Sequence, residues 1–315
     1  MVSLKGSICI VTGATRGIGK GIALQLGQAG ATVYITGRTL DPKPGCSVGG
    51  SLKETATEIE SRGGKCIPVK CDHSDHEQVK KLFQQVKSEQ NGRLDVLVNN
   101  AYSGVNAIFS SIGKPFWEQG DEMWDIVNNV GLRGHYLAAV EAAKLMTPAK
   151  KGLIVNISSP GGMRYLFNVA YGVGKEACDR MAADCAVELK KHNVAFVSLW
   201  PGPVPTETVM DKIEDTSINT NMKSSFANGE TIEFPGICIA HLAADPKIMK
   251  KTGRILFTTD IAEEYGFRDV DGKMPPNYRR LKDVLSVYHH PWLAACTPSF
   301  FKVPCWVLAC ATHKF

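Results

Sequence analysis

The stretch ICIVTGATRGIGKGIALQL, residues 8–26, decides the fold of this chain. An apolar run at 8–12 leads directly into a glycine-rich turn, and amphipathic helical periodicity begins at Ile18. Gly13, Gly17 and Gly19 let the backbone turn tightly and approach a phosphate group, and the free N–H groups at the start of the following helix favour an anion there. The segment therefore predicts a strand, a phosphate-binding loop and a helix.

The same alternation of a short apolar run and an amphipathic helix continues to about residue 265. Strands are expected at 8–12, 32–36, 65–69, 94–99, 153–157, 194–199 and 254–257, and helices at 18–28, 52–61, 76–90, 122–146 and 170–192. Several strands are continuous apolar runs, which is typical of parallel strands covered on both faces. We therefore predict an α/β fold, a doubly wound Rossmann-type, mostly parallel sheet in a single catalytic domain spanning 1–265.

Two segments depart from this alternation. Residues 204–234 have weak periodicity, and so long an irregular stretch is expected to be a functional lid or a mobile insert. Residues 266–315 form an apolar C-terminal extension to the domain.

Composition excludes several classes of protein. The chain has 315 residues, of which 44% are hydrophobic and 21% charged, as in ordinary globular proteins. Its 36 Lys and Arg against 31 Asp and Glu give a net charge of +5, but the basic pairs are scattered, so no nucleic-acid partner is expected. The ten cysteines contain no C-x-x-C motif, and HEQVK at 76–80 lacks the second histidine of a zinc-binding helix, so we expect no metal site. With no signal peptide apparent, we expect free thiols in a reducing compartment.

The end of the second predicted strand indicates which dinucleotide the loop would bind. A carboxylate there would bind the ribose 2′-OH of NAD, whereas arginine accommodates the 2′-phosphate of NADP. Here the strand is followed by Arg38, with no carboxylate before Asp41, and Arg16 in the glycine loop supplies a second guanidinium. The sequence therefore favours NADP(H) over NAD(H).

Tyr171 and Lys175 stand four residues apart, on one face of a predicted helix. A nearby ammonium favours phenolate, so we expect it to lower the pKa of Tyr171 toward the working pH. Tyr171 is then a candidate general acid or base for a carbonyl or alcohol. The strand predicted at 153–157 ends at Ser158 and Ser159, and strand register favours Ser159 as the hydroxyl that holds the substrate oxygen beside the phenol.

With these motifs in this order, the chain resembles the short-chain dehydrogenase/reductase family over roughly residues 4–265. It is most similar to a branch with a C-terminal extension. The resemblance implies a catalytic Ser159, Tyr171 and Lys175, with Lys175 also holding the nicotinamide ribose. It further implies cofactor contacts from Ile18, Asp72, the Asn99–Ala101 segment and Thr206 in the run Pro201–Thr206.

Three features differ from the family pattern, two of them single residues and the third a spacing. Tyr102 stands where the fourth residue of the N-N-A-G segment is usually glycine, and Gly131 stands at the usual catalytic asparagine. The usual serine–tyrosine spacing of about 13 residues fits Ser158, whereas Ser159 is 12 residues from Tyr171, so both serines stay candidates. The proton relay from the lysine is expected to run differently here, or more slowly.

The expected function is NADP(H)-dependent hydride transfer to or from a lipophilic carbonyl or secondary alcohol, steroid-like or xenobiotic. Residues 163–167 and the lid residues Met210, Ile213 and Met222 suggest an apolar cleft for that substrate. The alternative is a redox-responsive interaction protein that binds the cofactor with weak or vestigial catalysis. Gly131 favours the alternative, while the presence of serine, tyrosine and lysine together favours the enzyme.

The tail at 289–315 is apolar and aromatic but is interrupted by Pro298, Lys302 and Pro304, so it is too broken to span a bilayer. Aromatic rings with nearby lysine suit a monotopic element at a membrane surface. We expect association with the cytosolic face of the endoplasmic reticulum. The alternative is a soluble cytoplasmic protein whose tail folds back as extra core. The resemblance also implies a homo-oligomer formed through helices 122–146 and 170–192.

Overall fold

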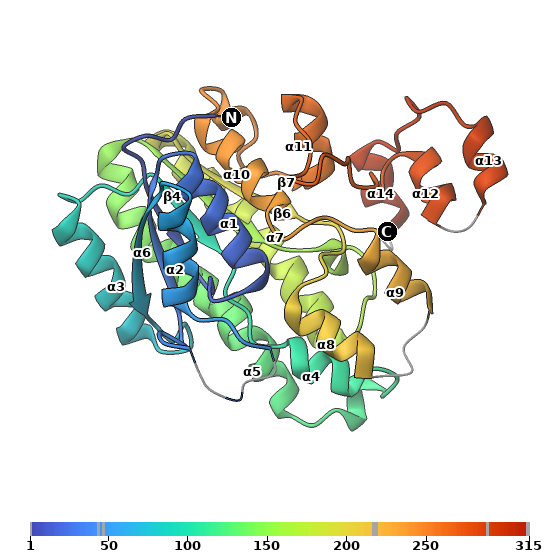
Figure 1. Cartoon of the computed structure of the whole chain (residues 1–315), viewed down its shortest axis with the longest axis horizontal. Coiled ribbons are helices and arrows are strands. Elements are labelled where there is room, and N and C mark those ends of the chain that lie inside the picture. Colours follow the sequence, from blue (N-terminus) through green and yellow to red (C-terminus); the bar gives the residue numbers. More distant parts are fainter. Residues whose placement is uncertain (1, 43–44, 46–47, 216–219, 288–289, 313–315) are drawn as a thin grey trace.

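A seven-stranded parallel sheet with helices on both faces forms the centre of the computed structural model (Figure 1). The structure describes residues 2–42, 45, 48–215, 220–287 and 290–312. The strand order is β3-β2-β1-β4-β5-β6-β7. The strands are β1 Ile8–Val11, β2 Thr32–Gly37, β3 Lys65–Lys70, β4 Val96–Asn99, β5 Gly152–Ile157, β6 Val194–Trp200 and β7 Ile255–Phe257. The predicted α/β fold class is confirmed, and each of the seven expected strands is present within two residues at either end.

Two hydrophobic clusters, one on each face of the sheet, explain why the strands are apolar throughout. In β1, Cys9 and Val11 join one cluster while Ile8 and Ile10 join the other, because successive side chains point to opposite faces. The first cluster is covered by α1 Gly17–Gln28, α2 Leu52–Ser61, α10 Phe234–Ala244 and α11 Thr258–Tyr265. The second is covered by α3 His76–Glu89, α6 His135–Ala149 and α7 Val169–Leu189.

Polar residues begin several of these helices. Ser51 accepts a hydrogen bond from the backbone N–H of Glu54 at the start of α2, and Asp75 caps α3 in the same way. Asn168 caps α7 by accepting from the N–H of Tyr171. These caps satisfy N–H groups that the first turn of a helix leaves without a partner.

The helix expected at 122–146 is divided. It consists of α5 Glu122–Asn128, a π-helical turn Asn129–Gly134 and α6. A π turn adds a residue to the helix and so shifts which side chains face the sheet. Short segments not expected from the sequence are α4 Val105–Ser111 and 3-10 turns at Phe116–Glu118, Pro160–Gly162, Lys190–His192 and Ile248–Lys250.

The expectation of an irregular segment at 204–234 is corrected. It contains α8 Glu207–Asp215 and α9 Thr220–Ala227, and α10 begins at its last residue, while 216–219 lie outside the described residues. Helices of two or three turns contain too few apolar repeats to show a clear 3.6-residue period.

The extension forms α12 Leu281–Val287, α13 Pro291–Cys296 and α14 Cys305–Thr312, at the end of the molecule beyond α11 (Figure 1). Its polar residues attach it to α11. Arg279 pairs with Asp260, Arg280 pairs with Glu263, and Lys302 Nζ lies 3.0 Å from Asp260. Among the described residues, we find no helix with the length and apolar character needed to cross a membrane.

The strand order reverses between β1 and β4. From β1 the chain continues through β2 to β3 toward one edge of the sheet, and then crosses to β4 and continues to β7 toward the other edge. In open α/β sheets, ligands bind outside the carboxyl ends of the strands at such a point. The glycine loop after β1, Asn100–Tyr102 after β4, the two serines after β5 and Pro201 after β6 all meet there.

Candidate active site

A cavity of about 1390 Å³ opens at the carboxyl ends of the strands. Pockets for a single small ligand usually measure about 300–1,000 Å³, so this one has room for a dinucleotide and a second molecule. It brings together nearly all the residues predicted for the site. These are Gly13, Arg16, Gly17, Ile18, Gly19, Arg38, Asp72, Ser159, Tyr171, Lys175 and Thr206.

The glycine loop forms one wall, and its geometry fits a phosphate group. Gly13 has a φ of +70°, and a Cβ there would lie 2.7 Å from the Cα of Ala101. The N–H of Gly17, at the start of α1, donates to a carboxylate oxygen of Glu207 at 2.9 Å. An anionic side chain thus lies on the helix N-terminus, where a pyrophosphate would be stabilised by the same N–H groups and dipole. Glu207 was not predicted, although it directly follows Thr206.

Two guanidinium groups line the cavity, that of Arg16 from the glycine loop and that of Arg38 directly after β2. Neither Arg16 nor Arg38 forms an ion pair with another described residue, whereas Asp41 pairs with Lys53 at 2.5 Å. Burial by itself would raise the pKa of Asp72, but hydrogen bonds from Ser74 and the charge of Arg38 hold it below the usual value. This end of the cavity therefore combines an ionised carboxylate with two guanidinium groups, neither of which has a direct ion pair with a carboxylate in the part of the chain that the structure describes.

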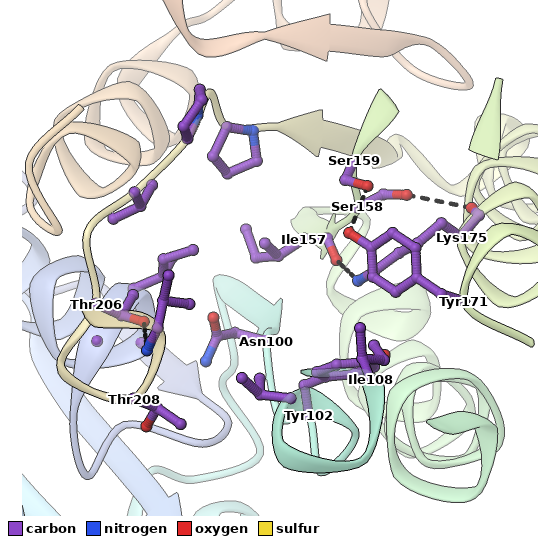
Figure 2. Close-up of a pocket in the computed structure, with 18 of the residues that line it drawn as sticks. Asn100, Tyr102, Ile108, Ile157, Ser158, Ser159, Tyr171, Lys175, Thr206 and Thr208 are labelled. Carbon is purple, nitrogen blue, oxygen red and sulfur yellow. Dashed lines mark hydrogen bonds between the residues drawn. The ribbon is translucent and has the colours of Figure 1, made fainter. Parts of the chain in front are cut away.

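Asn99 does not line the cavity, which corrects its predicted place at the cofactor. Its side chain is fully buried and donates to the carbonyl of His135 at 3.1 Å and to Asn156 Oδ1 at 3.0 Å, so it joins β4 to β5 and α6. Asn100 lies on the cavity instead, with Nδ2 donating to the carbonyl of Thr12 at 2.8 Å (Figure 2). The side chains of adjacent residues in an extended strand point to opposite faces, which explains the exchange.

The serine, tyrosine and lysine meet in the cavity (Figure 2). Ser159 Oγ lies 2.7 Å from Tyr171 Oη, close enough for the two hydroxyls to contact one substrate oxygen. Ser158 Oγ instead donates to the backbone carbonyl of Lys175 at 3.1 Å. The Asn168 cap, with Oδ1 accepting from the N–H of Tyr171 at 2.9 Å, fixes the phenol in the first turn of α7.

The protonation of this group differs from the expectation. Burial raises the pKa of Tyr171 to about 12, and the hydrogen bond with Ser159 only partly opposes it. Burial outweighs the lowering expected from Lys175, whose Nζ donates to the carbonyl of Ile157 at 3.0 Å and lies 5.9 Å from the centre of the Tyr171 ring. Burial also lowers the pKa of Lys175. Tyr171 is therefore protonated at neutral pH, the form in which it can act as a proton donor.

Aromatic and aliphatic side chains cover the other side of the cavity. Phe167 packs edge-on against Tyr171 with ring centres 5.2 Å apart, and its φ of +63° is rare for a bulky residue, so the fold holds it there at some cost. The apolar lining includes Ile108, Phe109, Met163, Leu166, Phe167, Val204, Val209, Phe226, Val284 and Leu308. The last two belong to the extension, which therefore completes the wall.

The predicted apolar cleft is thus formed by a partly different set of residues. Met163, Leu166 and Phe167 line it, but Met210 and Ile213 do not, and α8 contributes Val209 in their place. Tyr165, within the expected 163–167 segment, is 72% exposed and lies outside the cavity. The side chain of Met222 is outside the described part of the chain.

Glu230 is a second residue of the site that sequence reasoning missed. It is buried, accepts hydrogen bonds from the N–H of Gly202 and from Thr258 Oγ1, and so fixes the loop after β6. Burial raises its pKa to about 8. No motif signals it, because it approaches the loop from 28 residues further along the chain.

Replacing Glu230 with glutamine should change how stability depends on pH. The folded protein holds a proton on Glu230 that the unfolded chain releases above its ordinary pKa of 4.5, so this group lowers the free energy of unfolding as pH rises from about 5 to about 8. One proton corresponds to at most about 1.4 kcal/mol per pH unit. The free energy of unfolding, measured with urea across pH 5–9, should therefore fall less steeply with rising pH in Glu230→Gln than in the wild type. The exposed Glu118→Gln is the control, and equal slopes for wild type and Glu230→Gln would contradict the expectation.

The comparisons with known proteins agree with this geometry. The sequence matches the short chain dehydrogenase family over residues 7–217. It is 52% identical to Dehydrogenase/reductase SDR family member 1 of Homo sapiens over 99% of both chains. It is 33% identical to a 3beta-hydroxysteroid dehydrogenase of Mediterraneibacter gnavus, over 71% of this chain and 74% of that protein. A metagenomic short-chain oxidoreductase solved in complex with NADP has a similar structure, with a TM-score of 0.61 and 27% identity over 81% of this chain and 96% of that one.

Proposed function

Because the chain belongs to the short-chain dehydrogenase/reductase family, we propose that it is an NADP(H)-dependent oxidoreductase acting on a lipophilic carbonyl or secondary alcohol. The observation that carries the proposal is the 2.7 Å approach of Ser159 Oγ to Tyr171 Oη, beside Lys175, in a cavity that also contains the glycine loop. A bound nicotinamide dinucleotide supplies the hydride for carbonyl reduction or accepts it in alcohol oxidation.

Each residue of the cluster has a distinct task. Ser159 and Tyr171 together hold the substrate oxygen, and Tyr171 donates its proton as negative charge develops on that oxygen. The raised pKa of Tyr171, about 12, keeps the phenol protonated at neutral pH, the form that carbonyl reduction requires of a proton donor. Lys175 places a positive charge beside the phenol, which stabilises the phenolate that remains after proton transfer.

Preference for NADP(H) is supported by Arg16 and Arg38. Both line the cavity, Arg16 from the glycine loop before α1 and Arg38 directly after β2, and the acidic Asp41 pairs with Lys53. Two guanidinium groups suit a 2′-phosphate, because arginine binds phosphate oxygens through paired N–H donors. The solved relative that contains NADP adds support from a protein of the same fold.

A steroid-like or xenobiotic ketone or aldehyde is the proposed substrate class. Aromatic and aliphatic side chains such as Phe109, Met163 and Phe167 line the cavity with Tyr171, and the relative from Mediterraneibacter gnavus is named a 3beta-hydroxysteroid dehydrogenase. We expect kcat/KM for an apolar steroid ketone to exceed that for a polar sugar ketone by at least about 10²-fold, the effect of burying several methylene groups. Steady-state kinetics with both substrates measures this ratio, and a preference for the sugar would refute the substrate class.

We also propose that the extension contacts the cytosolic face of the endoplasmic reticulum membrane. Three of its basic residues, Arg279, Arg280 and Lys302, pair with Asp260 and Glu263 of α11. Three aromatic residues are instead exposed, Trp292 by 75%, Phe300 by 77% and Trp306 by 68%. Exposed aromatic rings on short helices and the turns between them suit the interface between lipid and water.

Flotation with phospholipid vesicles tests the membrane contact. The full chain should float with the vesicles, and changing Trp292, Phe300 and Trp306 together to serine should weaken binding at least about tenfold, because less apolar surface enters the interface. Trp117→Ser is the control, since Trp117 is equally exposed (72%) but belongs to the turn Phe116–Glu118, outside the extension. Fractionation of cells with alkaline carbonate extraction then identifies the membrane. Failure of the full chain to float, or equal loss in the control, would exclude the contact.

A further inference from the structure

Tyr102 lies against both ionisable residues of the proposed reaction (Figure 2). Its ring centre is 6.3 Å from that of Tyr171, with the rings nearly perpendicular, and Lys175 Nζ lies over its face at 5.0 Å from the centre. Lys175 is closer to this ring than to the Tyr171 ring, which is 5.9 Å away. Among the described residues, the Lys175 ammonium donates to the backbone carbonyl of Ile157 at 3.0 Å and forms no ion pair with a carboxylate.

Two glycines leave the space that the Tyr102 ring occupies. A Cβ at Gly131 would lie 2.5 Å from the ring atom Cδ2, and a Cβ at Gly104 would lie 2.7 Å from the hydroxyl oxygen. Neither glycine has a positive φ, so the backbone does not require glycine at either position. Both positions instead require the absence of a side chain, because a Cβ atom at either one would clash with the Tyr102 side chain.

The departures from the family pattern at Tyr102 and Gly131 are therefore one structural feature. Gly131 lies in the π-helical turn Asn129–Gly134, and its carbonyl accepts a hydrogen bond from Cys178 Sγ at 3.2 Å. That bond ties the turn to α7 one turn beyond Lys175. Gly131 therefore packs against one edge of the Tyr102 ring, while the Lys175 ammonium lies over the face of that ring.

We propose that Tyr102 is a positioning residue whose ring face holds the Lys175 ammonium beside Tyr171, in the slot left open by Gly131 and Gly104. The proposal rests on the proposed function, since it gives Tyr102 a part in the chemistry of Tyr171 and Lys175. It concerns the ring and not the hydroxyl, because Tyr102 Oη is buried with no hydrogen-bond partner among the described residues.

The charge of Lys175 depends on the groups packed around it. Burial lowers its pKa, while Cys178 and Asp179 on the same helix raise it. The titratable groups that face it are Tyr171, Cys178 and Asp179 from α7, His135 from α6 and Tyr102 from the loop after β4. A cation over an aromatic face gains about 0.5–2 kcal/mol, so the ring opposes the effect of burial and keeps the ammonium charged.

Titration of Lys175 tests this role directly. In protein labelled with 13C at the lysine Cε, with the Lys175 signal assigned from Lys175→Arg, we expect Tyr102→Leu to lower the pKa of Lys175 by about 0.4–1.5 pH units. Tyr102→Phe keeps the ring face and should leave the titration where it is. Gly131→Ala, whose Cβ would displace the ring, should lower the pKa of Lys175 as Tyr102→Leu does. Tyr136→Leu, an exposed tyrosine on α6, is the control and should show no shift.

The outcomes separate this proposal from the function on which it rests. An unchanged or raised pKa of Lys175 in Tyr102→Leu, or an equal shift in Tyr102→Phe, would overturn the role of the ring. If the wild type transfers no hydride, the proposed function fails, but the titration still decides the role of Tyr102. If hydride transfer is intact, the rising limb of the pH profile for alcohol oxidation should move upward in Tyr102→Leu and stay in place in Tyr102→Phe.

Discussion

Replacing Tyr171 with phenylalanine should reduce kcat/KM for ketone reduction by about 10²–10⁴-fold, the usual contribution of a positioned proton donor. Only the hydroxyl is lost, so the packing of the ring against Phe167, with centres 5.2 Å apart, is retained. Ser159 Oγ, 2.7 Å from that hydroxyl, would then face the substrate oxygen without a proton donor beside it. Steady-state assays that follow NADPH absorbance measure the loss, and calorimetry should show NADPH affinity within a factor of about three of wild type.

The control for this variant is Tyr136→Phe. Tyr136 is exposed on α6 and lies outside the cavity, so removal of its hydroxyl should leave the kinetics as they are. A loss below tenfold in Tyr171→Phe, with the protein folded and binding NADPH, would remove Tyr171 from the proton transfer.

The second large effect is expected at the two arginines of the cofactor end. Changing Arg16 and Arg38 together to alanine should raise the Kd for NADPH by about 10²-fold or more, because each hydrogen bond to a charged group contributes about 1.5–3 kcal/mol. The Kd for NADH should change less than threefold, since NADH lacks the 2′-phosphate that these residues would bind. Isothermal titration with each dinucleotide gives both constants.

Arg180→Ala provides the matched control for charge. Arg180 is exposed on α7, pairs with Asp184 at 2.8 Å and does not line the cavity. Equal weakening of NADH and NADPH in the double variant would show that the arginines act on a part common to both dinucleotides. No weakening of either would remove them from the cofactor site.

The sheet and its ligand-binding edge could be predicted from the sequence because they depend on local patterns. The β1 run and the glycines after it are adjacent in the chain, and the apolar strands reflect burial on both faces. The same local patterns do not predict where a long helix is interrupted, as the helix expected at 122–146 is. The π turn at Asn129–Gly134 depends on contacts with Tyr102 and Cys178, which are distant in sequence.

Side-chain direction limited the prediction of the site. The spacing of Tyr171 and Lys175 predicts that they share one helix face. It does not predict the hydrogen bond from the Lys175 ammonium to the backbone carbonyl of Ile157. The burial that sets the pKa of Tyr171 is a property of the assembled fold. Glu230 reaches the loop after β6 from a separate segment, so no local motif could reveal it.

The central claim, hydride transfer at Tyr171, is tested most directly by following the hydride itself. The protein is mixed with NADPH that carries deuterium on the transferable position of the nicotinamide C4 and with an apolar ketone, and the alcohol product is examined by mass spectrometry. Our account predicts one deuterium on the carbinol carbon for the wild type and about 10²–10⁴-fold slower labelling in Tyr171→Phe. Tight binding of NADPH with no label reaching any ketone or aldehyde of an apolar panel would contradict the account, and would instead indicate a cofactor-binding protein without this chemistry.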